Sequence, residues 1–121
     1  MLNFRNQGIV ITGGSSGLGL ELARRLAAEG ARLTLIARDR DRLERAAQEL
    51  RAQPGGATVR IESLDIRDEA AVQGCMQRIA DADGRIDMLI NSAGILREGR
   101  IESLPLTDFR EVMEINFFGL L

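Results

Sequence analysis

Residues 12–19 of this chain read Thr12-Gly13-Gly14-Ser15-Ser16-Gly17-Leu18-Gly19. They follow an apolar run at residues 9–11 and open a helical pattern whose apolar residues share one face: Leu18, Leu22, Ala23, Leu26 and Ala27. A glycine turn between a strand and a helix binds phosphate because free N–H groups and the positive end of the helix dipole face the anion. We therefore predict a phosphate site in this turn. These residues alone also fit an ordinary strand–helix connection.

The glycines of the turn have separate predicted roles. Gly13 permits a tight turn, Gly17 lets the backbone approach a pyrophosphate, and Gly19 allows the helix to pack closely on the strand. The predicted site comprises Gly13, Ser15, Ser16, Gly17, Leu18 and Gly19.

Composition narrows the class of protein. The 121 residues suffice for one domain with a core, and their 45% hydrophobic and 28% charged content is ordinary for a globular protein. A net charge of −2 argues against nucleic acid as the main partner. No apolar run approaches the roughly 20 residues that span a bilayer, and no signal peptide is visible. The single cysteine, Cys75, excludes an internal disulfide and is expected to pack in the core. We expect a cytoplasmic protein.

Several residue types are missing from the chain. All 16 basic residues are arginine, and there is no lysine, histidine, tyrosine or tryptophan. The usual groups for proton transfer near neutral pH are therefore nearly all absent. No metal site of cysteine and histidine is expected either.

Short apolar runs alternate with helical patterns along the chain. Strands are predicted at 8–12, 32–37, 57–64 and 86–90, and helices at 17–29, from Asp39 or Asp41 to before Pro54, at 68–81, and from a Thr107 cap through Phe117. This alternation predicts an α/β fold of Rossmann type, a doubly wound parallel sheet with strand order 3-2-1-4, in one domain over residues 1–121. The turn at 13–19 and residues 91–94 then face one crevice, where such sheets bind ligands.

Four segments together resemble the short-chain dehydrogenase/reductase family. They are residues 12–19, Asp65-Ile66, Asn91-Ser92-Ala93-Gly94 and Ile115-Asn116. Within the family, the chain looks most like 3-ketosphinganine reductases. The resemblance implies hydride transfer between a nicotinamide and a carbonyl or alcohol carbon of a small molecule. It also implies dimers or tetramers, although the oligomeric state of this protein stays open.

The end of the second strand bears on the choice of cofactor. NAD-binding proteins of this type usually place a carboxylate there for the ribose 2′-hydroxyl, whereas this chain has Ala37 followed by Arg38. A guanidinium pairs with a 2′-phosphate that a carboxylate would repel. We therefore predict NADP(H), held by Arg38 with help from Arg42. The alternating charges of residues 38–42 also fit a solvated face.

The resemblance implies further cofactor contacts. Asp65 would accept a hydrogen bond from the adenine amino group, although its position also suits turn or helix capping, and Ile66 follows it. Asn91, Ala93 and Gly94 would line the cofactor cleft. Asn116 matches the asparagine that family members use to hold a water in a proton relay, and a polar residue at a helix end is the plainer interpretation.

The residues that the family uses for chemistry are absent. A tyrosine, a lysine four residues later and a serine carry out its proton transfer, and they fall beyond the point where this sequence stops. We therefore expect a truncated chain that binds NADPH weakly, if it folds, and turns nothing over. A non-catalytic nucleotide-binding or interaction module is the alternative. The substrate is not derivable; resemblance suggests a long-chain 3-keto compound such as 3-ketosphinganine.

Overall fold

Strands and helices alternate in the structure, a computed structural model that describes residues 3–121. The elements are β1 (Gly8–Thr12), α1 (Gly17–Ala28), β2 (Arg32–Ala37), α2 (Arg40–Arg51), β3 (Thr58–Ser63), α3 (Glu69–Asp83), β4 (Met88–Asn91), α4 (Leu106–Asn116) and the 3-10 helix η1 (Phe118–Leu120). No helix among these is long and apolar enough to cross a membrane.

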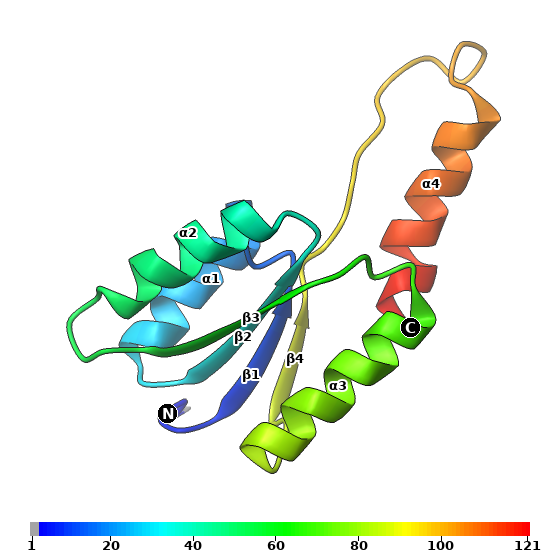
Figure 1. Cartoon of the computed structure of the whole chain (residues 1–121). Coiled ribbons are helices and arrows are strands. Elements are labelled where there is room, and N and C mark those ends of the chain that lie inside the picture. Colours follow the sequence, from blue (N-terminus) through cyan, green and yellow to red (C-terminus); the bar gives the residue numbers. More distant parts are fainter. Residues whose placement is uncertain (1–2) are drawn as a thin grey trace.

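The four strands form one parallel sheet in the order β3-β2-β1-β4, which confirms the predicted fold. β1 lies at the centre and is buried along its whole length, because it pairs with β2 on one side and β4 on the other. Helices α1 and α2 cover one face of the sheet, and α3 covers the other (Figure 1). The chain therefore changes sides of the sheet between β3 and β4.

Each face of the sheet has its own apolar core. Ile9, Ile11, Leu33 and Leu35 face α1 and α2, while Val10 and Ile36 face α3, because successive side chains of a strand point to opposite faces. One face of α2 is apolar and buried throughout: Leu43, Ala46, Ala47 and Leu50. On α3, Cys75 is buried as expected, and Ile79 is buried beside it, while Val72 and Met76 are half-buried.

Of the two residues predicted as possible caps of α2, Asp39 and Asp41, the structure shows Asp39 as the cap. Asp39 is the N-cap, and its side chain accepts a hydrogen bond from the Arg42 backbone N–H at 3.0 Å. Asp41 lies inside the first turn, so it is not the cap. Glu44 forms an ion pair with Arg40 at 3.4 Å. The helix therefore begins two residues earlier than it would with Asp41 as its cap.

Two expectations about the helices were wrong. The last helix has Pro105 as its N-cap, with no side-chain cap from Thr107, because proline already holds the extended backbone that precedes a helix. Leu18 was expected on the buried face of α1, but it is 69% exposed. The buried residues of α1 are Gly19, Ala23, Leu26 and Ala27, so its buried face begins one residue after Leu18.

The C-terminal part of the described chain covers little of the sheet. Residues 92–105 run away from the strands, and α4 returns beside the N-terminal end of α3 (Figure 1). Only Ile115 of α4 is buried, while Phe109, Met113 and the C-cap residue Phe117 are 40–52% exposed. β4 pairs with β1 alone among the described residues, and its Leu89 is 46% exposed.

Candidate functional site

The adjacent carboxyl ends of β1 and β4 form the centre of the site. Thr12 lies opposite Asn91 in the register. The backbone N–H of Ser92 donates to the Thr12 carbonyl at 3.1 Å, and that of Ala93 donates to Thr12 Oγ1 at 3.3 Å. These bonds join the two loops that leave the sheet at the point where the crossovers change sides. Ligands bind in such crevices of open α/β sheets.

Gly13 is required by both its conformation and its neighbours. Its φ is +69°, a region that side chains rarely adopt, and a Cβ there would lie 2.7 Å from the Ala93 nitrogen. Gly19 is required by packing, because its Cβ would overlap the Gly13 carbonyl oxygen. The roles predicted for these two glycines, a tight turn and close packing of α1, agree with this geometry.

The N-terminus of α1 is left open toward the crevice. Its N-cap, Ser16, makes no side-chain capping bond, whereas Asp39 caps α2 and Asp68 caps α3. No acidic residue lies in the first turn of α1. Gly17 has a φ of +53°, and nothing lies within 4 Å of where its Cβ would be. The helix therefore presents unpaired N–H groups and free space together, as an anion site requires.

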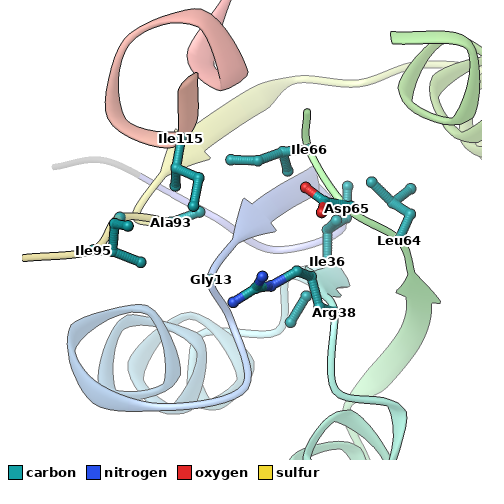
Figure 2. A pocket seen from close by; sticks show the side chains of 11 residues that line it. Gly13, Ile36, Arg38, Leu64, Asp65, Ile66, Ala93, Ile95 and Ile115 are labelled. Carbon is teal, nitrogen blue, oxygen red and sulfur yellow. The ribbon is translucent and has the colours of Figure 1, made fainter. Parts of the chain in front are cut away.

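Beside this turn lies a cavity of about 140 Å³. Figure 2 shows the Arg38 guanidinium and the Asp65 carboxylate pointing into it from one side, with Ala93, Ile95 and Ile115 on the other. Those two are the charged residues of the lining, which comprises Gly13, Ile36, Ala37, Arg38, Leu64, Asp65, Ile66, Ala93, Gly94, Ile95 and Ile115. A flat apolar group with polar edges suits such a lining, which has a cation and a carboxylate at one rim.

A second hollow lies on the other side of the glycine turn. It is lined by Ser15, Ser16, Gly17, Leu20, Arg42, Arg45, Ala46 and Glu49. Arg42 therefore does not share the cavity of Arg38, and its guanidinium lies 3.6 Å from the Asp39 carboxylate. The serines of the turn and two arginines of α2 give this hollow hydrogen-bond donors suited to an anion.

The Asp65 carboxylate is held by Arg67, two residues along. Arg67 Nη2 lies 2.6 Å from Asp65 Oδ2, and Arg67 Nε lies 3.0 Å from both carboxylate oxygens. The Arg67 backbone N–H also donates to Oδ1 at 3.0 Å, which is the turn-capping bond weighed from the sequence. The hydrogen bonds from the Arg67 side chain lower the pKa of Asp65, against a smaller opposing effect of burial, and Arg38 contributes least. Asp65 is therefore a carboxylate at neutral pH.

Comparison with known proteins decides the family. The family described as short chain dehydrogenase matches residues 7–121. The chain belongs to this family. It is 44% identical over 120 residues to dehydrogenase/reductase SDR family member 7B of Bos taurus. The aligned residues make up 95% of this chain and 37% of that protein. It is 34% identical over 114 residues to 3-ketodihydrosphingosine reductase of Bos taurus, with 92% and 34% covered. The narrower likeness expected from the sequence is thus the weaker of these two.

A solved structure gives the same result for the fold. NAD⁺-bound xylitol dehydrogenase superimposes with a TM-score of 0.91 at 32% identity, over 98% of this chain and 45% of that one. The chain therefore spans less than half the length of these relatives. What it shares with the family is the nucleotide-binding region of an oxidoreductase.

Asn116 is engaged with the loop after β4. Its Oδ1 accepts a hydrogen bond from the Ile95 backbone N–H at 2.8 Å, and its Nδ2 donates to the Ile95 carbonyl at 2.8 Å. This pair ties the end of α4 to the wall of the cavity. One N–H and one lone pair of the amide stay free. The predicted role of holding a water in a proton relay remains a prediction.

Of the residues predicted to line the cleft after β4, Ala93 and Gly94 line the cavity. Asn91 does not line it; it lines a separate hollow with Thr12 and Leu120, and its Oδ1 lies 3.5 Å from Thr12 Oγ1. Within residues 3–121 no cluster of three or more His, Cys, Asp or Glu is placed to hold a metal ion.

The predicted set included the lining residues Ile66 and Ala93 but left out Arg45, Arg67 and most of the other apolar lining residues. Arg45 could have been found, because it lies one helical turn after Arg42 on α2. The apolar residues Leu64, Ile95 and Ile115 carry no signal that separates a cavity wall from an ordinary core. Arg67 carried none either, because pairing within a loop has no periodicity.

Proposed function

We propose that the chain is the NADP(H)-binding part of an oxidoreductase that interconverts a ketone and a secondary alcohol. Membership of the family supports the oxidoreductase class, and the open turn beside the cavity fits a dinucleotide. The turn offers the pyrophosphate the N–H groups of α1, and the absence of a Cβ at Gly17 leaves room for it. When bound, the nicotinamide supplies or accepts the hydride.

Within the cofactor, we assign each end to residues of this chain. The adenine lies in the cavity, where Ile36 and Leu64 give it apolar contact and Asp65 accepts from its amino group. The pyrophosphate lies over residues 13–19. The wall formed by Ala93, Gly94 and Ile95 positions the rest of the dinucleotide against the loop that Asn116 holds.

Arg38 carries the choice of NADP(H) over NAD(H). It follows the last residue of β2, its guanidinium points into the cavity, and Ala37 stands where a carboxylate would bind a ribose 2′-hydroxyl. A 2′-phosphate bound by a guanidinium gains charge-assisted hydrogen bonds, each worth about 1.5–3 kcal/mol. A solved relative of the same fold binds NAD⁺, so the fold by itself does not favour NADP(H). The proposal therefore depends on Arg38 rather than on the fold.

For the substrate we propose a long-chain 3-keto compound, such as 3-ketosphinganine. The 34% identity to 3-ketodihydrosphingosine reductase supports it. The described residues offer one wall for such a substrate, in the loop that precedes α4.

Two titrations test the cofactor. NADPH and NADH are each titrated into the 121-residue chain, and binding is followed by the nucleotide's own fluorescence, which no tryptophan or tyrosine of the chain obscures. We expect NADPH to bind more tightly than NADH. Arg38→Ala is expected to weaken NADPH binding by roughly 10- to 100-fold while leaving NADH binding unchanged.

Arg40→Ala is the matched control. Arg40 is also an exposed arginine at the start of α2, but it pairs with Glu44 and does not line the cavity. It should leave both affinities unchanged. Equal binding of NADH and NADPH by the wild type, or equal losses in the two variants, would rule out the NADP(H) assignment.

A further inference from the structure

Arg67 forms hydrogen bonds to the Asp65 carboxylate. In the proposed function, the same carboxylate accepts a hydrogen bond from the adenine amino group. A carboxylate has about four lone-pair positions. Three N–H groups of Arg67 already donate to Asp65: the backbone N–H donates to Oδ1, the single Nε–H is shared between Oδ1 and Oδ2, and Nη2 donates to Oδ2. An amino group arriving at Asp65 therefore meets oxygens that already have donors. It competes with these donors for the carboxylate, and a shift of the Arg67 guanidinium frees lone pairs for it.

The Arg67 guanidinium has a second acidic neighbour. Its Nη1 lies 4.0 Å from Glu111 Oε1 on α4, and Glu111 Oε2 in turn lies 2.9 Å from Arg97 Nη2. Asp65 raises the pKa of Arg67 most, through hydrogen bonds and charge, and the charges of Glu111 and Glu114 raise it further. Arg67 thus lies between the Asp65 carboxylate, to which it is hydrogen-bonded, and the Glu111 carboxylate, 4.0 Å away.

Both pairs are partly open to water. The side chains of Asp65, Arg67 and Glu111 are 31%, 37% and 33% exposed. Ion pairs this exposed contribute little each, so exchanging one for the other costs little. A small shift of the guanidinium suffices because Nη1 is already near Glu111.

We propose that Arg67 is a positioning residue shared between Asp65 and Glu111, which grips Asp65 in the free chain and moves to Glu111 when a purine amino group binds Asp65. This inference rests on the proposed function, because it assumes that the cavity takes the adenine end of the cofactor. It makes Arg67 a determinant of base selection, although Arg67 does not line the cavity. It also links base binding to α4, the helix that carries Asn116.

The test compares two nucleotides that differ at one position of the base. NADPH carries an amino group at C6 of its purine, and reduced nicotinamide hypoxanthine dinucleotide phosphate carries an oxygen there. Arg67→Met keeps the length of the side chain and removes its donors. With Asp65 free, NADPH should bind about 2- to 5-fold more tightly, the range that an exposed ion pair allows. The hypoxanthine analogue should bind more weakly, because its oxygen faces an unpaired carboxylate and has lost a donor.

Changes at Glu111 should have the opposite sign. Glu111→Gln removes the alternative partner of Arg67, so NADPH should bind about 2- to 5-fold more weakly. In the double variant with Arg67→Met, the Glu111 change should have no further effect, because no guanidinium is left to move. Arg97→Met separates this exchange from simple anchoring of the loop: it leaves Glu111 free for Arg67 and should not weaken NADPH binding.

Arg78→Met serves as the matched control for lost charge. Arg78 also forms an exposed pair with a glutamate, Glu62, at 2.9 Å, and it lies away from the cavity on α3. It should leave both affinities unchanged. Circular dichroism verifies that each variant is folded; if Arg67→Met is not, Arg67→Lys is expected to show the same changes to a smaller extent.

The outcomes separate the two proposals. Wild-type chain that binds neither nucleotide contradicts the proposed function and this inference together. Wild-type chain that binds NADPH, with Arg67→Met leaving the ratio of the two affinities unchanged, overturns the inference alone. Equal changes in Arg67→Met and Arg78→Met would also overturn it, since net charge would then be the cause.

Discussion

Replacing Gly13 by alanine should lower the free energy of unfolding strongly, because two independent penalties coincide at this residue. An alanine forced into the left-handed region costs about 1–2 kcal/mol. Its Cβ would also lie 2.7 Å from the Ala93 nitrogen and 2.8 Å from the Ala93 Cα, both in backbone that is held by bonds to Thr12. Such overpacking costs about 1–3 kcal/mol. We expect a loss of about 2–5 kcal/mol, a large part of the roughly 5–15 kcal/mol typical of a domain.

Gly84→Ala isolates the conformational penalty. Gly84 ends α3 with a φ of +76°, and nothing lies within 4 Å of its Cβ position. Its alanine variant should lose only about 1–2 kcal/mol. Urea unfolding followed by circular dichroism at 222 nm measures both variants, since the linear dependence on urea gives the free energy of unfolding. Equal losses at Gly13 and Gly84 would refute the claim that the turn is packed against the loop after β4.

Four further results are expected. Burial raises the pKa of the Cys75 thiol to about 11, so at pH 8 iodoacetamide should modify the native chain about 100-fold more slowly than the chain in urea, by mass spectrometry; comparable rates would contradict its burial. Asp39→Ala should cost about 1 kcal/mol in urea unfolding and Asp41→Ala clearly less, because Asp39 is the cap of α2; the reverse order would contradict this. Because Arg67 lowers the pKa of Asp65, the stability that this pair contributes should be full above pH 3.8 and be lost as the pH falls through the lower pKa of the folded chain, so Asp65→Asn should flatten the acid side of a thermal-midpoint profile; an unchanged profile would argue against the pair. The purified 121-residue chain, which lacks tyrosine and lysine, should oxidise no NADPH with a ketone, and measurable turnover would refute this.

The parallel core of the fold could be predicted from the sequence in detail. Residues 8–12 and 32–37 were predicted as strands and are β1 and β2, because runs buried on both faces are apolar throughout and are bounded by turn residues. Gly30 marks the end of α1 with a φ of +82°. The fourth strand begins at Met88, not at residue 86, and residues 85–87 lead into it without regular secondary structure.

The parts that could not be predicted depend on what lies beside them in space. Leu18 has the spacing of a core residue, yet its side chain is exposed, whereas the next residue, Gly19, is buried. The hydrogen bonds from Arg67 to Asp65 depend on the conformation of a loop. Arg42 lies outside the cavity that Arg38 lines, and this depends on where α2 begins. The spacing of apolar residues predicts which face of a helix or strand is apolar, but not which other elements pack against that face.

The most direct test of the central claim, that a dinucleotide binds over the turn at residues 13–19, is a map of backbone amide shifts. ¹H–¹⁵N spectra of the chain are recorded with increasing NADPH. We expect the largest changes at Gly17, Leu18 and Gly19, whose N–H groups open α1, with smaller ones at Ala93 and Gly94 across the crevice. Saturating NADPH that leaves these amides unchanged, or that shifts only residues at the opposite end of the sheet, would contradict the claim.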